Sequence, residues 1–276
     1  MLVVAAVLYA LGIRRAARAG VAWPWHRTAA FFGLGFGSYA VIELGFLGTY
    51  SSGLRWAFVT RIALLLMIVP ALLSLGKPLE LLRAGLGPAG QERLDRIIQY
   101  RFFRVLGNAM VATLVAAGVF CLFLTPLAGV LRTSPLIGEV IGVATLVVGL
   151  LLIVPLMVLT GFHTSTFLAI EFLLAFVELV VDSIPGILLR LNDGIVDAVT
   201  TLAPGAAWWP NPLHDQHLAG DFLWFIAEVA DVPILIILLV RWSRLDRAEA
   251  SSYDELSDEE HDTLVQTHLR GERAAH

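Results

Sequence analysis

The chain contains seven apolar stretches that are divided by polar segments. They lie at residues 1–13, 28–50, 54–76, 105–130, 138–160, 164–184 and 217–240. A helix needs about 20 mostly apolar residues to cross the hydrocarbon core of a bilayer, and six of the seven stretches reach this length. The pattern therefore predicts an all-α fold, a polytopic membrane helix bundle with about seven transmembrane helices.

The first stretch, "MLVVAAVLYALGI", is shorter than a bilayer requires. It lacks the basic residues that precede the apolar core of a signal peptide, so we expect a retained first helix. Two explanations of its length stay open. Either the helix crosses a locally thinned membrane, or the natural chain begins upstream.

The polar segments differ in charge, and this asymmetry predicts their orientation. The segment "RRAARAGVAWPWHR" holds four arginines and no acidic residue, and the stretch from Lys77 to Arg104 has six basic residues against three acidic ones. Basic loops of membrane proteins face the cytoplasm. We therefore expect a multi-pass membrane protein with its N-terminus outside and its C-terminus in the cytoplasm.

Composition limits the classes of protein that the chain can represent. Only 15% of its residues are charged and 58% are hydrophobic, whereas a soluble domain carries about a quarter charged residues. We expect a membrane domain at residues 1–247 and an acidic, flexible tail at residues 248–276. The single cysteine, Cys121, excludes a cysteine-based metal site. No nucleotide loop, GxSxG or HExxH is present, so we expect a protein in contact with lipid that is neither an enzyme nor a nucleic-acid binder.

Two opposite charges occupy the same depth in the second and third stretches. Glu43 lies seven residues before Tyr50, and Arg61 lies seven residues after Leu54. At 1.5 Å per residue, both are about 10 Å inside the bilayer. An unpaired charge there is costly. We therefore predict an ion pair between the two helices, with a role in transport as the alternative.

The last two apolar stretches carry polar residues at helical spacing. In the sixth stretch, Glu171, Glu178 and Asp182 are separated by seven and four residues. In the seventh, the separations are four, three and four residues for His217, Asp221, Trp224 and Glu228. Each set shares one helical face. Such a face either forms hydrogen bonds with neighbouring helices or lines an ion path.

The segment "NPLHDQHLAGDFLWF", residues 211–225, opens the last apolar stretch. We expect Asp215 to cap the helix that it begins, because a carboxylate accepts the free backbone N–H groups of a first turn. A metal site is the alternative. His214, His217 and Asp221 follow at spacings of three and four, and a sixth helix that ends near Ser183 would bring Asp182 to the same level.

Two stretches resemble the CtaG family of bacterial cytochrome c oxidase assembly factors. The first is "LYALGIRRAARAGVAWPWHRTAAFFGLGFGSYAVIELGFLGTYSSGLRW" together with "LLLMIVPALLSLGKPLELLR". The second is "DQHLAGDFLW", in which Asp215, Gln216, Gly220 and Trp224 match the family signature at the start of the last helix. The matches keep their order, so the resemblance extends almost to Arg247.

The resemblance implies a part in maturing a haem-copper oxidase, with an oxidase subunit or another assembly factor as partner and copper supplied at the outer face. The family pattern HMxQH places two histidines four apart in the third helix. Counting back from Pro70, this chain has Phe58 and Ile62 there. Copper prefers sulfur or imidazole to carboxylate, so the copper ligands that remain would bind more weakly. They are His214, His217, Asp221 and Asp182.

Two functions follow from these observations. The leading one is a membrane-embedded assembly factor or chaperone for a cytochrome c oxidase, which works by protein contact and by copper delivery. The alternative is a small cation- or proton-coupled transporter whose path is made by Glu171, Glu178, Asp182, Glu228 and Asp231. The sequence lacks the two similar halves common in transporters, which favours the assembly factor.

Overall fold

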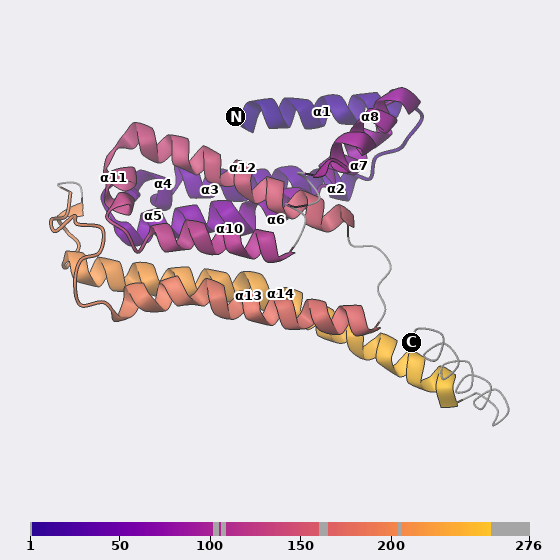
Figure 1. Ribbon diagram of the computed structural model, residues 1–276. Helices are drawn as coiled ribbons and strands as arrows, with labels where there is room; N and C mark the ends of the chain where they lie inside the picture. Colours follow the sequence, from indigo (N-terminus) through magenta and orange to yellow (C-terminus); the bar gives the residue numbers. More distant parts are fainter. Residues whose placement is uncertain (1, 102–104, 106–108, 160–164, 204–205, 255–276) are drawn as a thin grey trace.

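The structure is an elongated bundle in which most of the long helices run nearly parallel (Figure 1). This computed structural model describes residues 2–101, 105, 109–159, 165–203 and 206–254. All regular secondary structure assigned within these ranges is helical. The all-α class expected from the sequence is therefore confirmed.

The first half of the chain forms the upper part of the bundle in Figure 1. α1 (Leu2–Arg18) precedes two helical segments that each contain a short π-helical stretch. The first segment consists of α2 (Trp25–Ala29), η1 (Ala30–Phe36), α3 (Gly37–Leu44) and α4 (Phe46–Tyr50). The second consists of α5 (Arg55–Ala63), η2 (Leu64–Ile68) and α6 (Val69–Ser74). Two short helices, α7 (Pro78–Ala84) and α8 (Pro88–Ile98), follow.

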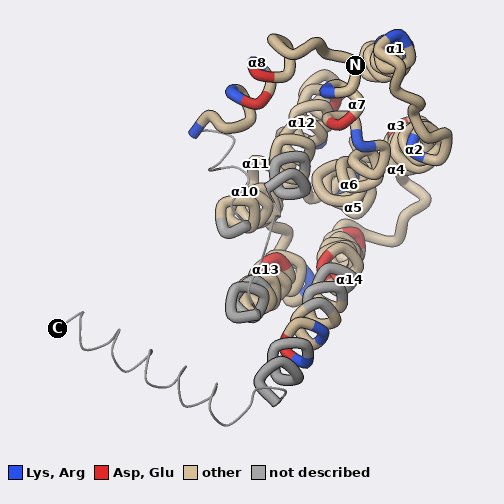
Figure 2. Tube along the Cα trace, turned by 90° about the vertical axis from the view of Figure 1, so that its right-hand side faces the viewer, with Lys and Arg blue, Asp and Glu red and all other residues tan. Residues whose placement is uncertain are grey.

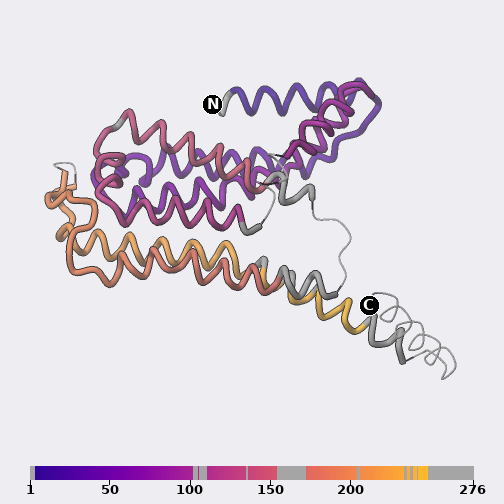
Figure 3. Tube along the Cα trace, viewed as in Figure 1, coloured from indigo at the N-terminus to yellow at the C-terminus, as the bar shows by residue number. Residues whose placement is uncertain are grey.

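The second half of the chain completes the bundle. α10 (Ala109–Leu122) and α11 (Leu127–Thr133) meet at a bend of 79°, so the stretch predicted as one helix at 105–130 is broken. α12 (Pro135–Leu159), α13 (Ser165–Leu191) and α14 (Pro212–Asp254) are longer. α13 and α14 pack side by side and form the lower layer in Figure 3.

Several helices are suited to a membrane. Within the described residues, four segments are long and apolar enough to cross one, at 25–50, 55–74, 136–153 and 172–191. A fifth is added if the bent pair of α10 and α11 counts as a single span. The described residues of the predicted stretches are mainly helical, but a count of seven spans is not established.

Two helix boundaries differ from the prediction, and both affect the candidate site. α13 does not end near Ser183 but continues through Pro185 to Leu191. Proline is tolerated inside membrane helices because neighbouring groups compensate for its missing N–H.

α14 is also longer than expected. It begins at Pro212 rather than at residue 217, and it continues to Asp254. The domain boundary expected at residue 247 therefore lies inside a helix. Residues 255–276, which make up most of the tail predicted to be flexible, lie outside the described residues.

The predicted contact between Glu43 and Arg61 is present and joins α3 to α5. Arg61 Nη2 donates to Glu43 Oε2 at 2.7 Å, and Nε donates to Oε1 at 3.0 Å. Arg61 Nη1 also donates to the carbonyl oxygen of Gly138 in α12, at 3.2 Å. The Arg61 side chain is 2% exposed and that of Glu43 is 9% exposed, so this pair connects three helices inside the bundle.

Two glycines allow α13 and α14 to approach each other closely. A Cβ added to Gly186 would lie 2.8 Å from the carbonyl oxygen of Gly220, and a Cβ added to Gly220 would lie 2.5 Å from the carbonyl oxygen of Gly186. Small residues of this kind are typical of helix contacts in membranes. Gly220, one of the four signature residues, therefore acts in packing.

Alanine at either glycine is expected to separate the two helices. We predict that Gly186→Ala and Gly220→Ala each lower the free energy of unfolding by about 1–3 kcal/mol, as overpacked contacts do. The measurement is thermal unfolding of the purified protein in detergent micelles. Gly118→Ala in α10 is the control, because nothing lies within 4 Å of its added Cβ. Equal effects at all three positions would show that the close approach is unimportant.

Candidate functional site at the loop end of the bundle

The predicted site residues gather at one end of the bundle. The connections at residues 51–54, 192–203 and 206–211 lie there, on the left in Figure 1, and we call it the loop end. α5 and α14 begin at the loop end, and α13 ends there. Side chains from distant parts of the sequence therefore meet at this place.

Asp215 caps a helix, but not the one that contains it. Its carboxylate oxygens accept the backbone N–H groups of Arg55 at 2.8 Å and of Trp56 at 3.2 Å. These groups belong to the first turn of α5, whose own N-cap residue makes no side-chain hydrogen bond. α14 is capped by Asn211, whose side-chain oxygen accepts the N–H of His214 at 2.7 Å. The prediction for Asp215 is correct about the chemistry and wrong about the helix.

Two arginines and two aspartates surround this cap, and we call Arg55, Arg132, Asp197 and Asp215 the buried charge cluster. Asp197 accepts hydrogen bonds from Arg55 Nη2 at 2.6 Å and from Arg132 Nη2 at 3.1 Å. Arg55 Nη1 lies 3.5 Å from Asp215 Oδ2. Each side chain is at most 5% exposed. The four charges therefore balance one another within the protein.

Burial and hydrogen bonding have opposite effects on Asp215, which precedes the predicted span of α14. Burial raises the pKa of its carboxyl group, whereas the N–H groups of Arg55 and Trp56 and the positive charges of Arg55 and Arg132 oppose that rise. A buried carboxylate depends on its hydrogen-bond donors and neighbouring cations, because burial removes the water that would otherwise solvate its charge.

The cluster also connects segments that are far apart in sequence. Arg132 Nη1 on α11 donates to the carbonyl oxygen of Ser52 at 3.0 Å. Arg55 donates to the carbonyl oxygen of Pro212 at 3.1 Å and to that of Val199. The starts of α5 and α14, the end of α11 and the long connection after α13 are thus held together by two guanidinium groups.

Gln216 fixes the backbone that follows α13. Its Oε1 accepts the N–H of Val196 at 2.8 Å, and its Nε2 donates to the carbonyl oxygens of Gly194 at 2.9 Å and Asn192 at 3.3 Å. The side chain is fully buried. Two adjacent signature residues therefore hold the first turn of α5 and the segment after α13.

Aromatic rings cover the loop end beside the cluster. Trp56 stacks against Phe46 and Phe222 with ring centroids 5.2 Å apart in each pair. Trp208 and Trp209 meet edge to face at 5.4 Å, and Trp208 is 56% exposed. Tryptophan and tyrosine are enriched where membrane proteins meet the interface with water. We call this surface the aromatic platform: Phe46, Tyr50, Trp56, Trp208, Trp209 and Phe222.

The predicted metal ligands are not brought together. His217 Nε2 lies 3.2 Å from the carbonyl oxygen of Asn192, Asp221 pairs at 3.0 Å with an arginine of α13, and the ring of His214 packs against an indole. In the described part of the chain, no group of three or more His, Cys, Asp or Glu residues is arranged to hold a metal ion. These residues therefore do not fit a copper site.

Asp182 is separated from the other predicted ligands because α13 extends beyond it. The helix continues to Leu191, which leaves Asp182 about 13 Å from its end at 1.5 Å per residue. The expectation that Asp182 lies level with His217 and Asp221 is thus corrected. Asp182 is fully buried, and within the described part of the chain neither of its carboxylate oxygens has a hydrogen-bond partner. Its electrostatic neighbours include another acidic residue, Asp231.

Removing the charge at Asp182 is expected to leave the fold intact or to stabilise it. Asparagine keeps the shape of the side chain, and no cation or donor is lost, since the carboxylate has none. We therefore predict that Asp182→Asn does not lower the unfolding temperature in detergent, while Asp197→Asn, which loses two arginine contacts, lowers it clearly. A fall at Asp182→Asn as large as that at Asp197→Asn would contradict this account.

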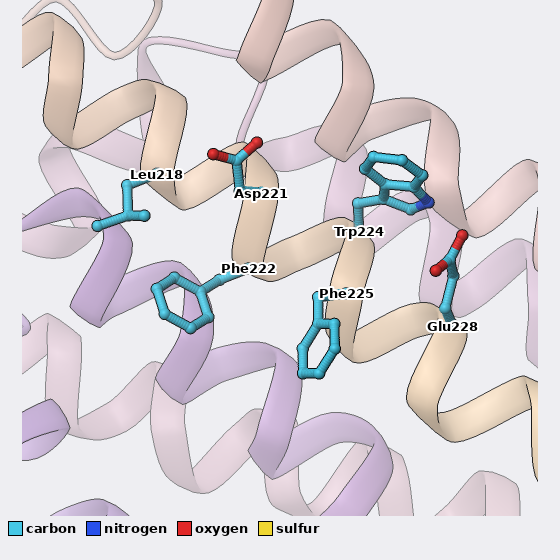
Figure 4. A pocket seen from close by; sticks show the side chains of 6 residues that line it. All are labelled: Leu218, Asp221, Phe222, Trp224, Phe225 and Glu228. Atoms are coloured by element: carbon cyan, nitrogen blue, oxygen red, sulfur yellow. The ribbon is translucent and has the colours of Figure 1, made fainter.

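The polar stripe on the last helix lies beside a groove. Figure 4 shows Asp221, Trp224 and Glu228 along α14, with the rings of Phe222 and Phe225 next to them. With one further residue, Leu218, they line a groove of about 540 Å³. Trp224, the fourth signature residue, therefore contributes to an open and mainly apolar surface of α14.

The third-helix positions at which the family pattern has histidines face the core. Phe58 and Ile62 are buried, and the cluster that they join includes Phe120, Phe123 and Leu223. Imidazoles at these two positions would point into the bundle between α5, α10 and α14. In this chain the same space is filled by apolar side chains, which cannot bind copper.

Sequence reasoning missed three members of the buried charge cluster. Arg55, Arg132 and Asp197 were not among the predicted site residues, because each lies at the edge of an apolar stretch or within a connection. The one available signal was their charge close to predicted spans, where an ionisable residue needs a partner.

The structure thus shows an all-α protein with several helices apolar enough to cross a membrane and a cluster of buried charges at its loop end. A family model described as "Cytochrome c oxidase caa3 assembly factor (Caa3_CtaG)" matches residues 7–245. The chain therefore belongs to this family of cytochrome c oxidase assembly factors, as the resemblance in its sequence implies.

Curated relatives are longer than this chain. It is 26% identical over 267 residues to the uncharacterized protein Mb0105 of Mycobacterium bovis and to the uncharacterized protein MT0111 of Mycobacterium tuberculosis. The uncharacterized protein ML1998 of Mycobacterium leprae is 24% identical over the same length. The matches cover 93–94% of this chain but 40% of each relative. No solved structure matches significantly.

Proposed function

We propose that this chain is an integral protein of the bacterial plasma membrane that assists assembly of a haem-copper cytochrome c oxidase. The observation that carries the proposal is the family match over residues 7–245. We infer that it acts without catalysis, by binding an oxidase subunit or another assembly factor at the loop end.

The arrangement of the loop end supports a role in protein contact. Aromatic residues are enriched in the cores of protein interfaces, and the aromatic platform offers exposed rings at Phe46 and Trp208. The buried charge cluster fixes the backbone beneath them. A surface that is already rigid loses less conformational entropy when it binds a partner, so the cluster would strengthen docking of a client.

Copper delivery is a finer form of the same proposal. The loop end offers two imidazoles, His214 and His217, and the third helix offers none at Phe58 and Ile62. Copper handled at this end would therefore need further ligands from the partner protein. We propose that contact with the client, rather than a resident copper site, is the main task of the loop end.

The proposal is tested by deleting the gene and measuring assembled oxidase in the membranes. Difference spectroscopy should show a loss of the oxidase haem signals, and expression of the wild-type chain should restore them. The His214→Ala/His217→Ala double variant should restore them as well, and copper binding to the purified protein should be the same with and without this change. Normal oxidase spectra in the deletion strain would overturn the proposal.

A transporter is the second candidate, and one observation favours it. Asp182 and Asp231 are buried, and both have carboxylate oxygens without partners, as residues on an ion path can have. Glu171 was expected on the same path, but its side chain is not among those that the structure describes. A transporter would leave the assembled oxidase intact when the gene is deleted, so the same experiment separates the two functions.

A further inference from the structure

α8 has an apolar face that the rest of the described structure covers only in part. Leu94, Ile97 and Ile98 lie on one side of this helix because residues three and four apart share a face. No residue of α8 is buried, and Ile97 is 54% exposed. Arg93 and Arg96 lie outside this apolar face. The helix therefore has the composition of a segment that lies in a membrane interface.

The direction of α8 agrees with such a position. Figure 2 looks along the bundle, so that α5, α6 and α12 are seen end-on, and α8 runs sideways across the view. In Figure 1 it lies at the end opposite the loop end, next to α7. An ion pair of 2.6 Å between Arg83 and Asp95 connects α8 to α7. If the bundle crosses a bilayer, α8 lies at one end of the bundle and is inclined to its long helices, where it can meet the membrane surface.

The charges at this end are mostly positive and partly unpaired. Between residues 77 and 101 there are five basic and three acidic residues. Glu80 and Asp95 are already paired with basic groups, and a hydrogen bond from Lys77 lowers the pKa of Glu80. The described structure contains no ion-pair partner for the exposed arginines Arg93, Arg96 and Arg101. The last part of α1, which carries three arginines, lies at the same end of the bundle (Figure 1).

We propose that α8 is an interfacial helix that binds anionic phospholipid headgroups. Its apolar face enters the boundary between headgroups and acyl chains, while Arg93, Arg96 and Arg101 contact the lipid phosphates. Each basic residue near an anionic surface favours binding by roughly fivefold. The proposal requires that the bundle spans a membrane, but it is independent of any part in oxidase assembly.

The test measures which lipids surround α8. Cys121 is changed to serine, Ile97 to cysteine, and a fluorophore is attached to the new thiol of the full-length protein. The protein is reconstituted into vesicles with equal amounts of phosphatidylglycerol and phosphatidylcholine, and bromine, which quenches fluorescence, is carried by one lipid or by the other. The ratio of quenching by the two lipids reports the local enrichment of phosphatidylglycerol.

We expect brominated phosphatidylglycerol to quench the label at residue 97 more strongly than brominated phosphatidylcholine. The Arg93→Gln/Arg96→Gln/Arg101→Gln variant should remove this preference, and Glu92→Gln on the same helix should increase it. High salt should weaken it, because exposed charges are screened. A label at Leu191→Cys, at the loop end, provides the reference ratio. All four charged positions are exposed, so the variants should unfold at the wild-type temperature.

Three results would overturn the proposal. The first is equal quenching by both lipids at residue 97, and the second is a preference that the triple variant retains. The third is an absence of quenching by either lipid, which would show that α8 does not contact the membrane. None of these results bears on oxidase assembly, so the proposed function would stand or fall separately.

Discussion

Replacing Arg61 with methionine is expected to lower the free energy of unfolding by about 3–5 kcal/mol, as the loss of one partner of a buried ion pair does. Glu43 would keep a carboxylate that is 9% exposed but would lose both of its hydrogen bonds from the guanidinium. The contact with Gly138 in α12 is lost as well. The measurement is denaturation of the purified protein in mixed micelles, followed by circular dichroism.

The double variant Glu43→Gln/Arg61→Met provides the decisive comparison. It removes both charges, so no carboxylate remains without a cation, and we expect it to be more stable than Arg61→Met alone. The control is Arg27→Gln, which breaks the exposed pair with Glu80 and should change stability by about 1 kcal/mol or less. A double variant less stable than Arg61→Met would show that Glu43 does not depend on Arg61.

Replacing Asp215 with alanine is expected to damage both the fold and the function. The change removes the cap of α5, which is worth about 0.5–2 kcal/mol in other helices. It also leaves Arg55 and Arg132 with Asp197 as the one remaining carboxylate of the cluster. Together these losses should lower the free energy of unfolding by about 3–5 kcal/mol, as for other broken buried ion networks. Restoration of oxidase in the deletion strain should fail with this variant.

The matched control is Asp221→Ala, six residues further along the same helix. Asp221 also pairs with an arginine, but the two side chains are 47% and 48% exposed, and such pairs contribute little. We therefore expect near wild-type stability and oxidase content with Asp221→Ala. If Asp215→Ala behaves in the same way, the buried charge cluster does not hold the loop end together.

The helical fold and the ion pair of Glu43 and Arg61 could be predicted from local patterns. Apolar stretches near 20 residues favour helices, since a helix satisfies its own backbone hydrogen bonds in lipid. Two such stretches joined by a short connection run antiparallel, so equal distances from that connection place Glu43 and Arg61 at one depth. Their contact at 2.7 Å follows from chain geometry and from the cost of an unpaired charge.

The extent of the last two helices could not be predicted in the same way. Pro185 follows the polar residues Asp182 and Ser183 and suggests an end, yet α13 continues to Leu191. The close contact of Gly186 with Gly220 keeps this part of the helix against its neighbour. The two glycines are far apart in sequence, so no local pattern indicates that they meet. Because the predicted end of α13 was too early, Asp182 was wrongly expected at the depth of His217 and Asp221.

Local patterns in the sequence are enough to predict a helical chain that is apolar enough for a membrane, and to predict Asp215 as an acceptor for free backbone N–H groups. Which N–H groups it accepts depends on how the helices pack. Asp215 caps the first turn of a helix that begins 160 positions earlier. The same packing buries Arg55, Arg132 and Asp197 together. A charged side chain needs a charged partner within the protein once folding removes the water around it. Which charged residues become buried together depends on which segments meet.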